Sequence, residues 1–268
     1  MMLKHSFFFV CLALGALVAL GACSKTPVEP PVNGQQHLLD LLNAEDRLHR
    51  DLSLTSEAMG RKMKYTVWLP GGYDASKQYP FLYLLHGYGD DNNSWVDKGD
   101  AQRIARDYVA QGGTPMVIVM PDGLTDFYRG AFEDYMFKEL MPRLESTYHC
   151  NGKRALAGLS MGGYGTLYYG LKYPDMFLYG YAMSPATDVP SFRDLIVAQS
   201  DRSVFPYFTL ESGSNDYTVS IESVRACDEM LTGYELPHRF IERSGGHDWN
   251  FWPVCLEKAL VEIGKVFK

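Results

Sequence analysis

The stretch that decides the fold runs from Arg154 to Gly165 and reads Arg-Ala-Leu-Ala-Gly-Leu-Ser-Met-Gly-Gly-Tyr-Gly. Its first four residues are typical of a short buried strand, and residues 161–173 have the character of a helix. Between them, Gly158-Leu159-Ser160-Met161-Gly162 matches the sharp turn that presents a serine hydroxyl at the end of a strand. Glycines around such a turn also suit close packing of a helix on a sheet. The pentapeptide alone therefore does not establish catalysis.

Apolar strand-like segments and helical segments alternate along the rest of the chain. The expected strands are 61–70, 81–85, 116–120, 154–157, 177–183, 207–210 and 238–241. The expected helices are 101–110, 133–148, 161–173, 221–231 and 254–267. This alternation, without an internal repeat, predicts an α/β fold with a mostly parallel central sheet and helices on both faces. Ligands in such folds bind beyond the carboxyl ends of the strands, so catalytic groups should lie in loops that follow strands.

A serine nucleophile requires two partners, whose positions in the chain can be tested. A histidine must accept the hydroxyl proton, and a carboxylate must orient that histidine. In this architecture the chain order is serine, acid, histidine. Asp216 follows the expected strand 207–210, and His247 follows the expected strand 238–241. The sequence therefore predicts Ser160 as nucleophile, Asp216 as acid and His247 as base.

Other histidines and acids have weaker positions for these roles. His86 and His149 precede the serine, and His238 begins an expected strand. Two of the acids fall where no strand precedes a loop, which favours a solvated loop or a helix cap, and a third is still within the end of a strand. These alternatives are His86, His149, His238, Asp188, Asp201 and Glu211.

Backbone amides are the expected donors to the negative oxygen that develops during ester cleavage, because fixed donors need no reorganisation. The Met161 N–H directly follows the nucleophile. A second donor should come from His86-Gly87-Tyr88-Gly89, where the Tyr88 N–H is the first choice and the Gly87 N–H the near alternative. The reaction requires no metal and no organic cofactor.

Length, composition and charge describe a globular enzyme rather than a nucleic-acid-binding protein. The chain has 268 residues, of which 46% are hydrophobic, and a formal net charge of −7. No run of Lys or Arg could follow a phosphate backbone, so nucleic acid is not an expected partner. One catalytic domain, residues 37–268, is the economical interpretation.

The first residues are typical of a bacterial export signal. Basic residues precede an apolar run over residues 7–20 that is too short for a comfortable membrane span. Leu20-Gly21-Ala22-Cys23 resembles a lipobox, which predicts a signal peptide over 1–22 and a lipid anchor on Cys23. Residues 23–36 are expected to form a Pro-rich tether. The alternatives are an ordinary signal peptide with a chance cysteine, or an uncleaved anchor.

Motifs spread over almost the whole expected domain resemble the esterase D branch of the α/β-hydrolases, which includes carbohydrate esterase family 1. The matching stretches are Tyr65-Thr66-Val67-Trp68-Leu69-Pro70, residues 79–95, Met120-Pro121-Asp122-Gly123, residues 138–142, residues 157–165, residues 213–216 and Gly245-Gly246-His247-Asp248. The resemblance implies an α/β-hydrolase fold and places Ser160, Asp216 and His247 at the family's catalytic positions.

The family's range of substrates leaves the ester open. Its members include feruloyl and acetylxylan esterases, S-formylglutathione hydrolases, siderophore esterases and mycolyl transferases. Export to the periplasm or cell surface favours feruloyl or acetyl esters of plant cell-wall polysaccharide such as xylan. The rings of Phe127, Tyr128 and Trp249 are expected near the substrate. Acyl transfer, siderophore-type hydrolysis and non-catalytic carbohydrate binding remain as alternatives.

Three cysteines in the expected domain are left open by the sequence. An exported protein can pair two of them in a disulfide, but buried free thiols fit at least as well. They are Cys150, Cys227 and Cys255.

Overall fold

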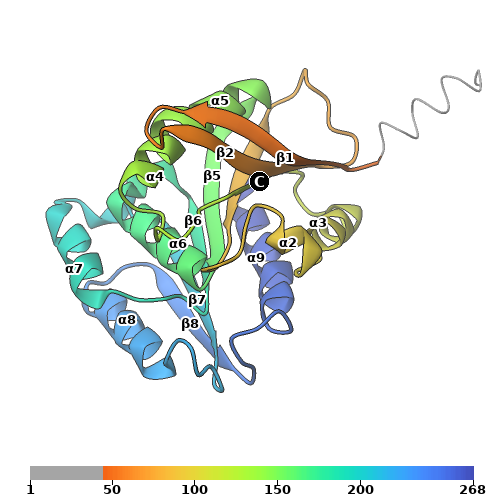
Figure 1. Cartoon of the computed structure of the whole chain (residues 1–268). Coiled ribbons are helices and arrows are strands. Elements are labelled where there is room, and N and C mark those ends of the chain that lie inside the picture. Colours follow the sequence, from red (N-terminus) through yellow and green to blue (C-terminus); the bar gives the residue numbers. More distant parts are fainter. Residues whose placement is uncertain (1–44) are drawn as a thin grey trace, which may run out of the picture.

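Eight strands form one central sheet in residues 45–268, the part of the chain that the computed structural model describes (Figure 1). The strands are β1 (Arg47–Ser56), β2 (Arg61–Leu69), β3 (Tyr79–Leu85), β4 (Val117–Pro121), β5 (Cys150–Leu159), β6 (Tyr179–Met183), β7 (Tyr207–Gly213) and β8 (His238–Arg243). Their order in the sheet is β1-β2-β4-β3-β5-β6-β7-β8. Strands β3 to β8 run parallel to their neighbours, whereas β2 pairs antiparallel with both β1 and β4. The predicted mostly parallel sheet is confirmed.

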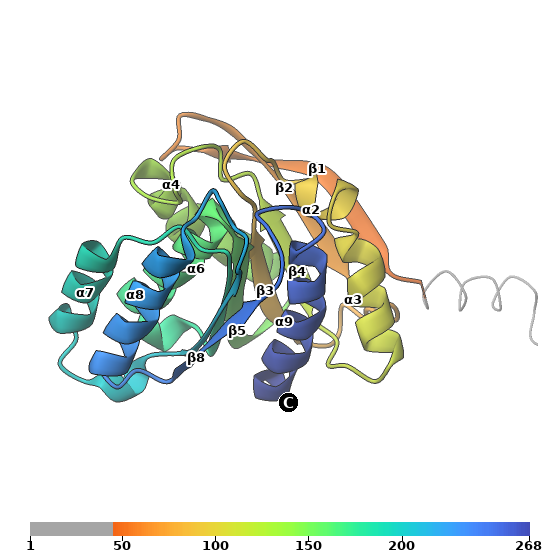
Figure 2. The same ribbon diagram turned by 90° about the horizontal axis from the view of Figure 1, so that it is seen from below.

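Helices cover both faces of this sheet. They are α2 (Ser94–Asp97), α3 (Ala101–Ala110), α4 (Ala131–Asp134), α5 (Met141–Thr147), α6 (Met161–Lys172), α7 (Val189–Ala198), α8 (Ile221–Gly233) and α9 (Trp252–Phe267). Figure 2 shows α6, α7 and α8 on one face, and α3 and α9 on the other. The predicted two-sided arrangement is confirmed.

Each face of the sheet has its own hydrophobic core, because successive side chains of a strand point to opposite faces. In β3, Phe81, Tyr83 and Leu85 pack into the core under α6, α7 and α8. Leu82 and Leu84 pack into the core under α3 and α9. All seven residues of β3 are buried, as expected for a central strand covered on both sides.

Several elements differ from the expectation, among them the short helix α2, which is missing from it. Strand β1 is missing from the prediction, because as an edge strand it carries the exposed charges of Arg50 and Asp51 and a register shift between His49 and Leu52. Helix α7 is also missing, although Asp188 caps it by accepting from the Ser191 N–H at 3.2 Å. The expected helix 133–148 is broken by a π-helical segment, Tyr135–Leu140.

Some predictions fall on residues 1–44 and so lie outside the described residues: the signal peptide, the lipid anchor on Cys23 and the tether. Between residues 45 and 268, no helix has the length and hydropathy needed to cross a bilayer. The cysteines in this range are free thiols, and of these Cys227 and Cys255 are buried.

Candidate active site

The candidate nucleophile lies in a strained turn between β5 and α6. Ser160 has φ +52° and ψ −113°, a conformation that costs a non-glycine residue about 1–3 kcal/mol. Three backbone hydrogen bonds hold it there: its N–H donates to the Met183 carbonyl (2.8 Å), and its carbonyl accepts from Tyr164 (2.9 Å) and Ala186 (3.1 Å). The surrounding backbone therefore fixes the serine at the end of a central strand.

The two flanking glycines are required because backbones approach very closely at this turn. A Cβ atom at Gly158 would lie 2.4 Å from the carbonyl oxygen of Gly162, and one at Gly162 would lie 2.4 Å from that of Leu85. Any side chain at either position would push α6 away from the sheet. The glycines thus bring the first turn of α6 directly against β3 and β5.

Asp216 and His247 form a hydrogen-bonded pair on the loops after β7 and β8. The distance between His247 Nδ1 and Asp216 Oδ2 is 2.7 Å. The other carboxylate oxygen, Oδ1, accepts from the N–H groups of Thr218 (2.9 Å) and Val219 (2.8 Å). Burial opposes ionisation of Asp216, but these bonds, led by that from His247, lower its pKa below the ordinary value. An ionised acceptor at Nδ1 leaves the lone pair of neutral His247 on Nε2, the atom that can take a proton.

Strand direction brings these residues to one edge of the sheet. Ser160, Asp216 and His247 follow the carboxyl ends of β5, β7 and β8, which run parallel within the sheet. Trp252 packs the edge of its ring against His247, with ring centroids 5.0 Å apart at 88°. We call this edge, formed by the carboxyl ends of β3 to β8, the catalytic edge.

The predicted oxyanion loop, His86-Gly87-Tyr88-Gly89, lies against the nucleophile turn. A Cβ atom at Gly87 would be 3.6 Å from Cβ of Ser160. The Gly87 carbonyl accepts from His86 Nδ1 (2.7 Å) and from the Asp90 N–H (3.2 Å). Since N–H and C=O point in opposite directions across a trans peptide, these bonds also fix the direction of the Tyr88 N–H.

The second predicted donor follows from the position of the helix. Met161 is the first residue of α6, and the first N–H groups of a helix have no acceptor within it. The Met161 N–H is therefore available beside Ser160 without breaking a helical hydrogen bond.

His86 supports the oxyanion loop, a role that the sequence did not predict. Its side chain is 1% exposed, and Nε2 accepts from the Gly123 N–H at 2.7 Å. That bond requires a lone pair on Nε2, so Nδ1 carries the hydrogen donated to Gly87. The Tyr128 hydroxyl also donates to the His86 carbonyl at 2.9 Å. The signal in the sequence was a histidine placed directly after a buried strand and directly before a glycine.

The family model named Esterase matches residues 56–263, which is most of the chain. The chain belongs to the Esterase family. This esterase is 29% identical over 264 residues to an endo-1,4-beta-xylanase/feruloyl esterase of Xylanibacter ruminicola, covering 91% of the chain and 35% of that relative. It is 25% identical over 235 residues to an acetyl esterase of Caldicellulosiruptor saccharolyticus, covering 71% of the chain and 85% of that relative.

A solved ferulic acid esterase has the same architecture. Its TM-score is 0.76 at 26% identity, and the match covers 84% of the esterase and 100% of that chain. The esterase spans about a third of the length of the Xylanibacter relative. Together these matches confirm the resemblance to the esterase D branch with carbohydrate esterase family 1.

Of the aromatic residues expected near substrate, Tyr128 lies in the core of the esterase. It is completely buried, and its carbonyl accepts from the Tyr169 hydroxyl. The expectation that its ring contacts substrate is corrected, because the ring has no accessible face and its hydroxyl is used to hold His86. Tyr128 is instead a support beneath the oxyanion loop.

Phe127 lies at the surface beside the oxyanion loop. Its ring centroid is 6.3 Å from that of Tyr88 and 5.6 Å from that of Tyr164. Phe127 and Tyr128 both have positive φ angles, +52° and +59°, which are unfavourable for large side chains. The buried hydrogen bonds of Tyr128 hold this strained pair, and the turn thereby presents Phe127 on the catalytic edge.

Trp249 is half-buried in a cluster of tryptophans. Its ring packs edge-on against Trp95 (5.2 Å between centroids) and against Trp252 (5.1 Å). Since Trp252 in turn packs on His247, this cluster supports the histidine loop from the α9 side of the sheet.

The alternative histidine and acid candidates have structural partners elsewhere in the esterase. His238 begins β8, and its Nε2 lies 3.0 Å from Asp228 Oδ1. Glu211 is fully buried and accepts from Lys258 Nζ at 2.7 Å. Glu211 also accepts from Arg243 Nε, so this acid is committed to ion pairs away from His247.

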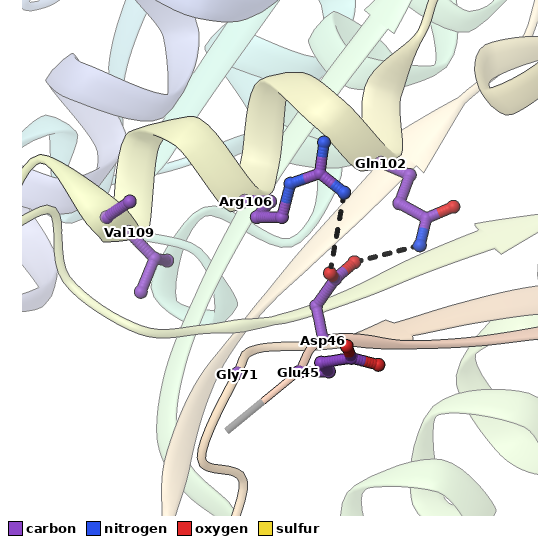
Figure 3. A pocket seen from close by; sticks show the side chains of 7 residues that line it. Glu45, Asp46, Gly71, Gln102, Arg106 and Val109 are labelled. Carbon is purple, nitrogen blue, oxygen red and sulfur yellow. Dashed lines mark hydrogen bonds and ion pairs between the residues drawn. The ribbon is translucent and has the colours of Figure 1, made fainter. Parts of the chain in front are cut away.

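A hollow of about 500 Å³ lies between α3 and the segments that precede β1 and follow β2 (Figure 3). Asp46 in its wall accepts from Gln102 at 2.9 Å and lies 3.9 Å from Arg106. The hollow also contacts Gly71, which follows the end of β2. Because β2 runs antiparallel to β4, that end lies at the edge of the sheet opposite the catalytic edge. The hollow is therefore separate from Ser160.

Proposed function

We propose that this esterase cleaves its substrate through an acyl-enzyme on Ser160. The observation that carries the proposal is the 2.7 Å hydrogen bond from His247 Nδ1 to buried Asp216, on the same edge as the strained Ser160 turn. It leaves Nε2 of His247 as a base facing away from the carboxylate. A serine between β5 and α6 becomes a nucleophile when such a base takes its proton.

The reaction proceeds in two steps. Ser160 Oγ attacks the ester carbonyl while His247 takes the hydroxyl proton, and the N–H groups of Met161 and Tyr88 bind the negative oxygen. His247 then gives its proton to the departing alcohol. Water activated by His247 releases the acid and restores Ser160. Each backbone donor of this kind is worth about 100- to 1,000-fold in rate.

The proposed substrates are feruloyl or acetyl esters of a plant cell-wall polysaccharide such as xylan. Feruloyl esters are the first choice, because the similar proteins include a xylanase/feruloyl esterase and a ferulic acid esterase. The exposed rings of Tyr88 and Phe127 next to the oxyanion loop offer apolar faces to an aromatic acyl group. The similarity to an acetyl esterase supports the acetyl ester as second candidate.

The test compares hydrolysis of methyl ferulate and of an acetylated xylo-oligosaccharide by the signal-free protein. A Ser160→Ala variant should lose at least about 1,000-fold in kcat, because loss of the nucleophile leaves only the oxyanion donors and substrate binding. Ser214→Ala, an exposed serine near Asp216, is the matched control and should keep full activity. Residual activity of Ser160→Ala close to wild type would overturn the assignment, and turnover of neither ester would reject both substrates.

We further propose that the mature protein is exported and anchored through lipid on Cys23. Arg47, the first residue of β1, pairs with Leu69 at the end of β2. Because β2 is antiparallel to β4, this end of β1 lies at the edge opposite the catalytic edge. A membrane tether entering there would leave Ser160 directed away from the lipid and open to a polymer.

A further inference from the structure

Exposed aromatic side chains gather on the catalytic edge. Four aromatic residues are exposed among residues 45–268: Tyr88 (65%), Phe127 (37%), Tyr207 (37%) and Tyr217 (96%). Tyr88, Phe127 and Tyr217 lie on loops after β3, β4 and β7, at the catalytic edge. Tyr207 begins β7 and therefore lies at the opposite edge.

The strand order places these rings on two sides of the nucleophile. Tyr88 and Phe127 follow β3 and β4, on one side of β5. Tyr217 follows β7, on the other side. A polymer crossing Ser160 along this edge would therefore meet an aromatic ring on each side.

The direction of proton transfer decides which side meets the alcohol. His247 must give its proton to the departing oxygen, so the alcohol part of the ester lies on the His247 side. Tyr217 directly follows Asp216, which holds His247. Consecutive Cα atoms are about 3.8 Å apart, so the backbone of Tyr217 lies on the His247 side of the nucleophile, the side on which the alcohol leaves.

We propose that Tyr217 stacks against a sugar ring of the alcohol part of the substrate and forms a subsite for the polysaccharide. This inference rests on the proposed function, since it takes the leaving alcohol to be a sugar. Aromatic faces bind the apolar face of a sugar ring while its hydroxyls remain in water. The exposed ring of Tyr217 thus has the chemistry for a partner that brings both an apolar face and many hydroxyls.

The loop that carries Tyr217 is held in place without using the ring. Asp216 Oδ1 accepts from the N–H groups of Thr218 and Val219, the two residues after Tyr217. The backbone is therefore fixed by the same carboxylate that orients His247. A ring projecting from a fixed backbone loses less conformational entropy on binding than one on a loose loop.

The kinetic test uses two feruloyl esters that differ in their alcohol: methyl ferulate and a feruloylated xylo-oligosaccharide. Tyr217→Ala should raise KM for the oligosaccharide ester about tenfold, the size expected for one aromatic contact of about 1.4 kcal/mol. Its kcat and KM for methyl ferulate should stay within about twofold of wild type, because the alcohol part of this ester is a single methyl group that does not extend to Tyr217. Tyr217→Phe and Tyr217→Trp should keep tight binding, since stacking needs the ring and not the hydroxyl.

Tyr207→Ala is the matched control, because it removes an exposed tyrosine at the opposite edge. It should change neither ester's kinetics. Equal losses for both esters in Tyr217→Ala would overturn the subsite and point to a disturbed Asp216–His247 pair. No change for either ester would overturn it as well.

A binding measurement separates failure of the subsite from failure of the proposed function. Unesterified xylo-oligosaccharide is titrated into wild type and Tyr217→Ala, with binding followed by NMR. About tenfold weaker binding by Tyr217→Ala supports the subsite even where feruloyl esters are not cleaved. Equal binding by both proteins, or no binding by wild type, overturns it. Absence of turnover by wild type rejects the feruloyl ester alone.

Discussion

At the scale of single residues, the candidate site depends on a few side chains that fix backbone groups. His86 is the main example, because one buried imidazole connects the Gly87 carbonyl with the Gly123 N–H. It touches none of the reacting atoms in the proposed mechanism. Its effect is to orient the peptide whose N–H, that of Tyr88, is the proposed oxyanion donor.

Replacing His86 should therefore lower kcat with little change in KM. His86→Ala leaves the Gly87 carbonyl with the longer bond from the Asp90 N–H alone, and it leaves the Gly123 N–H buried without a partner, a cost of about 1–3 kcal/mol in stability. We expect kcat on methyl ferulate to fall about 100-fold, as for loss of one oxyanion donor. KM should stay within about threefold, because the ground-state carbonyl depends less on that donor.

The conservative variant distinguishes positioning from general destabilisation. In His86→Asn the side-chain amide can donate to the Gly87 carbonyl in place of Nδ1, so part of kcat should return. His149→Asn, at an exposed histidine, is the matched control and should behave as wild type. The positioning role would be contradicted by a His86→Ala protein that has the same Tm as wild type and keeps more than about a third of wild-type kcat.

At the scale of secondary-structure elements, the critical contact is that of helix α6 with strands β3 and β5. Gly158 and Gly162 allow backbone atoms to touch where other helices keep a layer of side chains between themselves and the sheet. The positive φ of Ser160 is maintained by this contact and by the hydrogen bond to β6.

Adding one methyl group at this contact should destabilise the domain. Gly158→Ala places Cβ 2.4 Å from the Gly162 carbonyl oxygen, so α6 must shift. We expect the free energy of unfolding in urea to fall by about 1–3 kcal/mol, with a loss of activity as Ser160 moves. Gly233→Ala at the end of α8, where a Cβ meets no atom within 4 Å, is the control and should be neutral or slightly stabilising. Equal stability of the two variants would refute the close-contact argument.

At the scale of the whole molecule, the sheet separates two edges with different roles. The carboxyl ends of the parallel strands carry Ser160, Asp216 and His247, whereas β1 begins at the opposite edge. With the proposed anchor on Cys23, the domain would be held at the edge away from its substrate.

Cys23→Ser should release the protein from the membrane without changing its chemistry. The full-length wild type should sediment with membranes and the variant should stay in the soluble fraction, because the variant lacks the thiol that carries the lipid. Both should hydrolyse methyl ferulate at the same rate per molecule, since β1, the first strand after the proposed anchor, begins at the edge opposite Ser160. Equal sedimentation of both proteins would reject the lipid anchor, and unequal rates would reject the proposed orientation.

Sequence alone determined the alternation of strands and helices, because it depends on local apolar patterns and on glycines at turns. It also supplied the chain order that selects Ser160, Asp216 and His247. It did not reveal β1, whose exposed charges are acceptable on an edge strand paired on one side only. It also missed α7, although a helix cap was one of the roles expected for Asp188.

Only the tertiary structure decided which side chains are exposed at the catalytic edge and which lie beneath them as supports. Tyr128 and Phe127 are adjacent aromatic residues, yet one is completely buried and the other exposed. Their backbone angles depend on hydrogen bonds to His86 and Tyr169, residues about 40 positions away in the chain. The exposure of Tyr217 and the burial of His86 likewise follow from the strand order, which places distant loops side by side. Local sequence sets the elements, but contacts between distant residues set the direction of each ring.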